Sequence, residues 1–152
     1  MDENDDLDIT ELVERYEQMR ALGKSMYLDA DEFSLLIDYY AEMGDMDEAE
    51  ALIDQGLKMH PGSSEIMTQY AKKLVFAERY EEAYSYLQHI SDDDNIDLAL
   101  LKIETLYHLD RDDEAEAMVD RVLKQDISVE DLFTFVSELG YIYNDFDKLE
   151  SA

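Results

Sequence analysis

The feature that most constrains this chain is a short motif that returns at nearly constant intervals. Residues 44–49 read GDMDEA, and residues 78–83 read ERYEEA, 34 positions later. A third copy, DRDDEA, occupies residues 110–115 after an interval of 32, and a fourth, NDFDKL at residues 144–149, follows after another 34. Recurrence at this period indicates stacked structural units, each of which buries its apolar face against its neighbours.

The residue types around these motifs favour helices. The chain has one proline and five glycines among 152 residues, whereas strand-rich chains need frequent turn formers and β-branched residues. Before each motif, apolar residues recur at spacings of three and four, which places them on one helical face. From the first helix to the fourth, these positions are Phe33, Leu36, Ile37 and Tyr40; Met67, Tyr70, Ala71 and Leu74; Ala99, Ile103 and Leu106; and Phe133, Val136, Ser137 and Gly140. Because Lys102 falls where a large apolar side chain is expected, a shift of one residue in the third helix stays open.

One more helix is predicted ahead of the repeats, over residues 9–22. Its apolar face would contain Ile9, Leu12, Val13, Tyr16, Met19 and Leu22. Asp8 and Glu11 have the spacing of a capping box, and Gly23 is a suitable stop. We therefore expect an acidic N-terminal segment with one helix in residues 1–29 and the repeats in residues 30–152.

The repeat region resembles the tetratricopeptide repeat family over residues 30–152. The first copy carries the resemblance most specifically, with Phe33, Leu36, Tyr40, Gly44, Ala49, Ile53, Gly56 and Pro61. The resemblance implies an all-α fold, an α-α superhelix of antiparallel helix pairs, with about three and a half repeats and an incomplete last one. Small residues at Ala49, Ala83 and Ala115 would let paired helices cross closely. Later copies lack the proline and the turn glycine, so an irregular helical bundle is the alternative.

The charge of the chain excludes several classes of partner. Its 12 Lys and Arg residues face 40 Asp and Glu residues, a formal charge of −28. Such a surface repels phosphate backbones and anionic lipids, so we expect neither nucleic acid nor membrane as a partner. The acidic start differs from a signal or transit peptide, and no apolar run approaches the ~20 residues that span a bilayer. We expect a cytoplasmic protein, without disulfides because cysteine is absent.

Motifs for catalysis or metal binding are weak. No two of His60, His89 and His108 have the spacing that presents a metal-binding pair on a helix. Asp93, Asn95 and Asp97 imitate a calcium loop, but that loop needs glycine at Leu98. The sequence contains no nucleophile elbow or glycine-rich phosphate loop. We expect no enzyme, no cofactor and no resident metal.

The resemblance also implies where a partner would bind, because in this family the first helix of each pair lines the concave face. The positions carried over are Leu35, Asp38, Glu42, Gln69, Lys72, Phe76, Leu101, Glu104, Tyr107, Phe135, Glu138 and Tyr141. They form an apolar and aromatic strip flanked by acids. The predicted function is therefore a scaffold that binds a basic, apolar segment of a partner protein. One subclass grips the carboxylate of chaperones with cations and asparagine, and the acids with the lone Lys72 argue against it.

A structural role is the main rival to a binding role. The chain would then be part of a longer solenoid, or would associate with itself. Phe133, Val136, Phe146 and Leu149 at the open end would be uncovered, and two copies related by a two-fold axis would cover each other. We expect such a dimer to be weak and favoured by salt. A metal-dependent regulator or an enzyme is the less favoured rival.

Overall fold

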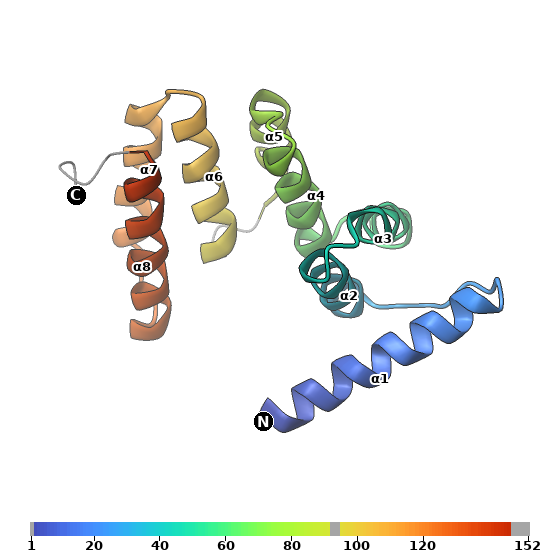
Figure 1. The fold of residues 1–152 in the computed structure, drawn as a ribbon. Coiled ribbons are helices and arrows are strands. Elements are labelled where there is room, and N and C mark those ends of the chain that lie inside the picture. The colour runs from blue at the N-terminus through green and yellow to red at the C-terminus, as the bar shows by residue number, and fades with distance from the viewer. Residues whose placement is uncertain (1, 92–94, 147–152) are drawn as a thin grey trace. The chain divides into compact units, whose positions relative to one another are not determined.

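The computed structural model describes residues 2–91 and 95–146 and, in these ranges, contains eight helices and no strand (Figure 1). The helices are α1 (Asp2–Ala21), α2 (Ala30–Glu42), α3 (Met46–Met59), α4 (Ser64–Phe76), α5 (Tyr80–Leu87), α6 (Ile96–His108), α7 (Asp112–Leu123) and α8 (Val129–Asp145). The predicted all-helical class and helical pairing are confirmed. The chain forms two compact units, residues 1–70 (the N-terminal unit) and residues 71–152 (the C-terminal unit).

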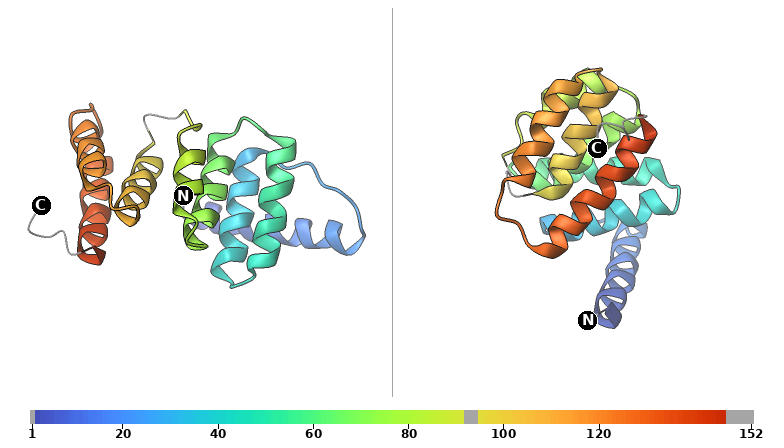
Figure 2. Two further views of the ribbon diagram at one scale, coloured as in Figure 1. Left: turned by 90° about the horizontal axis from the view of Figure 1, so that it is seen from above. Right: turned by 90° about the vertical axis from the view of Figure 1, so that its left-hand side faces the viewer.

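In the N-terminal unit, α1 packs on α2, and α2 lies beside α3 (Figure 2). The core contains Leu12, Val13 and Tyr16 of α1 together with the predicted apolar face of α2. Helix α2 begins with a complete capping box, in which the Glu32 amide donates to Asp29 Oδ1 at 2.8 Å and the Asp29 amide donates to Glu32 Oε1 at 3.0 Å.

Two details of the N-terminal helix differ from the prediction. Helix α1 begins at Asp2 and not at Asp8, so the predicted capping box of Asp8 and Glu11 lies inside the helix and does not start it. Leu22 lies outside the helix and is 67% exposed. The predicted stop is confirmed, since Gly23 has a φ of +67° and the amide of Lys24 donates to the carbonyl of Met19 at 2.9 Å.

The three turns at the motifs have the same backbone structure although their residues differ. Gly44, Glu78 and Asp110 all have positive φ. In each turn the amide of the next residue donates a hydrogen bond of 2.9 Å to the carbonyl five residues before it. The pairs are Asp45 to Tyr40, Arg79 to Leu74 and Arg111 to Leu106. These are Schellman closures of α2, α4 and α6. The loss of glycine in the later copies therefore leaves the repeated turn intact.

In the C-terminal unit, α6 packs against α5, α7 and α8. Its core includes Ile103, Leu106, Ala115 and Val122. The alanines of the three motifs, Ala49, Ala83 and Ala115, are at most 2% exposed, which agrees with the close packing predicted for them.

The predicted face of α8 is wrong. Phe133 is 74% exposed and Val136 is 52% exposed, whereas Phe135, Leu139 and Tyr143 are buried. Helix α8 has 17 residues, while α2, α4 and α6 have 13 each. Phe135 and Leu139 lie one residue before the predicted Val136 and Gly140, so the inward face of α8 is rotated by about 100° from the predicted face. Helix α8 also continues to Asp145, through the first residues of the fourth motif, so that motif does not mark its end.

Candidate functional site

Within the C-terminal unit, residues of α4, α6 and α8 line a groove of about 380 Å³. Five of the twelve predicted residues line it: Lys72, Leu101, Glu104, Glu138 and Tyr141. Leu101 and Glu104 are three residues apart on α6, and Glu138 and Tyr141 are three residues apart on α8. Each pair therefore lies on one face of its helix.

The groove combines an apolar wall with acidic groups. Leu100 and Leu101 are nearly buried, and Tyr141 is 68% exposed. Four carboxylates line the groove, from Asp97, Glu104, Glu138 and Asp145, against the single cation of Lys72. Sequence reasoning missed Asp97, Ile142 and Asp145, although Ile142 and Asp145 lie four residues after Glu138 and Tyr141 and so continue their stripe.

The carboxyl of Glu104, which lines the groove, has a pKa above its ordinary value. Burial raises its pKa, the charge of Asp145 raises it further, and His108 opposes both effects. His108 itself stacks on Tyr80, with 4.0 Å between ring centroids. A positively charged side chain beside Glu104 would stabilise its ionised form, so the groove is suited to a basic ligand.

The sequence also matches the model of a known protein family. The tetratricopeptide repeat model matches residues 40–95 and 77–126, more than half of the chain. The chain belongs to the tetratricopeptide repeat family. Comparisons with curated proteins and with solved structures gave no match. No helix in the described part of the chain is long and apolar enough to cross a bilayer.

Two predicted positions of this tetratricopeptide repeat chain are in the core and not on its surface. Phe135 is fully buried, and Tyr107 is 2% exposed. Tyr107 packs against Tyr143 and Phe146, with ring centroids 6.0 and 5.6 Å apart. Both assignments were carried over from the repeat register. Helix α8 does not keep that register at Phe135, and Tyr107 of α6 is covered by Tyr143 and Phe146. Phe76 is 79% exposed but does not line the groove.

Two predicted positions of the N-terminal unit, Asp38 and Gln69, belong to a polar link between α2 and α4. Nε2 of Gln69 donates to Ser34 Oγ at 3.1 Å and to Asp38 Oδ1 at 2.8 Å. Gln69 is nearly buried, while Leu35 is 47% exposed and Asp38 and Glu42 are exposed. Gln69 therefore joins the first helices of two successive repeats, and Leu35, Asp38 and Glu42 remain accessible.

An acidic pair lies next to this link. The carboxyl of Glu65 is desolvated and hydrogen-bonded to Asp31, which raises the pKa of Glu65 to about 7, and the charge of Asp31 acts in the same direction. Sequence reasoning did not identify this pair because the two residues are 34 positions apart and meet only when α2 and α4 pack.

Asn95, one residue of the calcium-like spacing, has another role in the structure. Asn95 caps α6, with its side-chain oxygen accepting from the Leu98 amide at 3.1 Å. Asp93 lies outside the described residues. Among the residues described, no group of three or more histidines and acids could hold a metal ion.

Proposed function

We propose that this chain is a non-enzymatic scaffold that binds a basic, apolar segment of a partner protein in the groove of its C-terminal unit. Tetratricopeptide repeats are in general protein–protein interaction modules. The observation that carries the finer proposal is the groove itself, where four carboxylates and one lysine surround an apolar wall. Such a surface offers apolar burial for affinity and charge complementarity for orientation.

The net charge of the chain favours some classes of partner over others. At −28, the chain attracts basic proteins over long distances and repels nucleic acid and anionic membrane. A cytoplasmic protein partner remains our expectation.

The test uses a fluorescently labelled peptide of lysine and leucine and measures its anisotropy with the full chain at physiological salt. The double variant Glu104→Gln/Glu138→Gln removes two charges from the groove. Glu116→Gln/Glu130→Gln removes two charges from exposed positions of the same unit outside the groove, and serves as the matched control. We expect the groove variant to weaken binding about tenfold more than the control.

Tyr141→Ala tests the apolar contribution. Loss of an exposed tyrosine from the groove should weaken the peptide several-fold without changing the net charge. Equal weakening by the two double variants, together with no effect of Tyr141→Ala, would show that the peptide binds only to the overall negative field.

Self-association is the second candidate, favoured by the outer face of α8. Val129, Phe133 and Val136 are 84%, 74% and 52% exposed and lie with Gly140 on one face of the helix. A side-chain carbon added at Gly140 would meet no atom within 4 Å, so another backbone has room to approach there. Of the other two residues predicted at this end, Phe146 is half-buried beside Tyr107 and His108, and Leu149 lies outside the described residues.

A further inference from the structure

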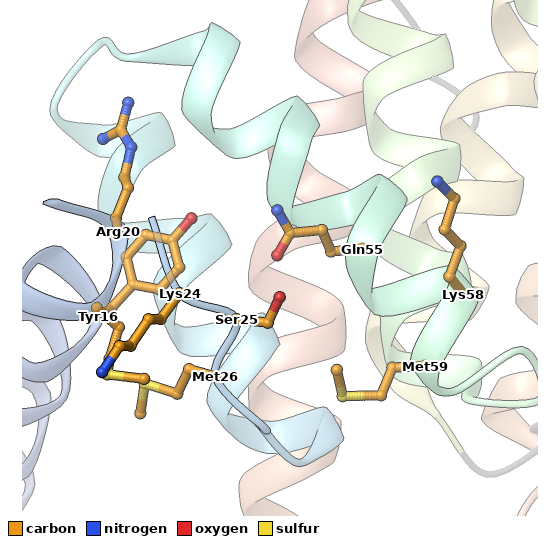
Figure 3. A pocket seen from close by; sticks show the side chains of 9 residues that line it. Tyr16, Arg20, Lys24, Ser25, Met26, Gln55, Lys58 and Met59 are labelled. Carbon is orange, nitrogen blue, oxygen red and sulfur yellow. The ribbon is translucent and has the colours of Figure 1, made fainter. Parts of the chain in front are cut away.

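The N-terminal unit contains a pocket of about 470 Å³ between the end of α1, the connector that follows it and α3 (Figure 3). Its charged residues are Arg20, Lys24 and Lys58, and no acidic side chain lines it. In Figure 3, Lys24 and Lys58 lie on opposite sides of the pocket. The charged residues that line this pocket are basic, whereas those that line the groove of the C-terminal unit are mainly acidic.

The cations are concentrated here to an unusual degree. Residues 1–70 contain only four lysines and arginines, namely Arg15, Arg20, Lys24 and Lys58, and three of them line this one pocket. The acids are far more numerous in the same residues, yet none lines it.

Two of the three cations are not neutralised within the described structure. Arg20 forms an ion pair with Glu48 at 2.9 Å, and Arg15, outside the pocket, reaches Glu32 at 3.5 Å. Lys24 and Lys58 form no ion pair with the described residues. The pocket therefore has a local excess of positive charge that an anionic ligand would balance.

Apart from the polar side chains of Ser25 and Gln55, the remaining lining is apolar and adaptable. Met19, Met26 and Met59 contribute thioether side chains, and Tyr16 contributes its ring. Methionine has three flexible bonds and a polarisable sulfur, so a methionine-lined surface adapts to large apolar side chains. A simple inorganic anion would leave this apolar lining unused.

We propose that this pocket is a second binding site, which takes an acidic peptide segment of a partner protein that carries a large apolar side chain. The carboxylates of the segment lie between Lys24 and Lys58, and its apolar side chain contacts the three methionines. Together with the basic segment in the other groove, the chain then binds partner segments of opposite charge on separate units.

Two of the three cations also have a structural role that the test must separate from binding. Lys58 lies in the last turn of α3 and Arg20 in that of α1, where cations stabilise the helix dipole. Reversing such a charge lowers stability whether or not a ligand binds. Each variant therefore needs a thermal melt, and binding is compared at a temperature where all proteins are folded.

The probe is a fluorescein-labelled peptide of aspartate, glutamate and leucine, titrated with the full chain at low and at physiological salt. Lys24→Glu and Lys58→Glu should each weaken it about tenfold. Lys124→Glu makes the same charge change at an exposed position of the C-terminal unit, and should leave the affinity unchanged. A peptide with serine in place of leucine should bind several-fold more weakly, and the lysine–leucine peptide should not compete.

The proposal is overturned if no saturable binding of the acidic peptide is found at low salt. Equal weakening by Lys124→Glu would show an effect of net charge alone. Equal binding of the serine peptide would reduce the pocket to an anion site. These outcomes are independent of the groove, because the lysine–leucine peptide and the Glu104→Gln/Glu138→Gln variant test that surface separately.

Discussion

The phenol of Tyr16 donates a hydrogen bond to the carboxylate of Glu48 and thereby joins α1 to α3. Glu48 is 7% exposed, and its second oxygen pairs with Arg20 at 2.9 Å. Burial and the acceptance of this bond by Glu48 raise the pKa of Tyr16 far above its ordinary value. The N-terminal helix is thus held to the first motif by a buried polar contact in addition to its apolar face.

Replacement of Glu48 by alanine should destabilise the N-terminal unit by about 1–3 kcal/mol, because the buried phenol of Tyr16 loses its acceptor and Arg20 loses its partner. Chemical denaturation measures the free energy of unfolding. Glu14→Ala, at an exposed position of α1, should change it by no more than ~0.5 kcal/mol. Equal effects of the two substitutions would show that the Tyr16–Glu48 contact contributes nothing.

The repeated turns should respond oppositely to glycine and alanine. Glu78 has a φ of 62°, which costs a residue with a side chain about 1–2 kcal/mol. Glycine removes that cost but gains freedom in the unfolded chain, so Glu78→Gly should stabilise the protein by roughly 0.5–1 kcal/mol. Gly44→Ala should destabilise it by ~1 kcal/mol.

Thermal or chemical unfolding checks both substitutions of the turns. Glu78→Gln is the control, because it removes the same charge and retains the side chain that positive φ disfavours. A gain in stability from Glu78→Gln as large as from Glu78→Gly would assign the effect to charge and contradict the backbone explanation.

Helix α7 offers a matched pair for the close packing of the motif alanines. Ala115 is fully buried, and Ala117 on the same helix is exposed. Ala115→Leu should destabilise the fold by about 1–3 kcal/mol through overpacking, and Ala117→Leu should have little effect. If differential scanning calorimetry gives both variants the same melting temperature, the motif alanine has space around it and the packing argument fails.

The repeat was predictable because its signals are local. The positions Phe33, Leu36 and Tyr40 recur at helical spacing, and the motif after them ends α2, α4 and α6 at the same backbone turn. Even Glu78 and Asp110 adopt the conformation of Gly44. Local periodicity and turn position therefore determine the helices, and a change of residue type in one turn does not alter them.

The remaining features depend on contacts between distant residues. Phe135 and not Phe133 faces the core of the C-terminal unit, and the fourth motif does not predict this because α8 continues through its first residues. The pocket unites Arg20, Lys24 and Lys58 only after α1 has packed beside α3. The pairing of Asp31 with Glu65 likewise follows from packing, which spacing along one helix cannot predict.

The Glu65–Asp31 pair should make stability depend on pH. In the folded chain the pKa of Glu65 is about 7, above its ordinary value of 4.5, so between these values the folded state binds more protons than the unfolded state. Stability contributed by this carboxyl is therefore present at pH 5 and is lost as the pH rises through about 7. Glu65→Gln should flatten that part of the curve.

Denaturation at pH 5, 6 and 7.5 measures this dependence. The control is Glu14→Gln, which removes an exposed carboxyl of the same unit and should leave the shape of the curve unchanged. If Glu65→Gln has the same pH dependence as the unsubstituted chain, the carboxyl of Glu65 titrates at an ordinary value.

The outer face of α8 should mediate a weak dimer. Two antiparallel copies of α8 would bury Phe133 and Val136 against each other, and the open space at Gly140 lets the backbones approach. Two chains of −28 repel each other, so salt should favour the dimer by screening that repulsion. Sedimentation should therefore show a monomer at low salt and a growing dimer fraction as salt and protein concentration rise.

Phe133→Glu should return the protein to a monomer, because it places a charge at the centre of the apolar face. Phe76→Glu provides the matched control, since Phe76 is another exposed phenylalanine of the C-terminal unit, at 79%, and the substitution adds the same charge elsewhere. Retention of the dimer in Phe76→Glu and its loss in Phe133→Glu would locate the contact on α8. A chain that stays monomeric at high concentration in physiological salt has no such interface, and the exposed face of α8 would then need another occupant.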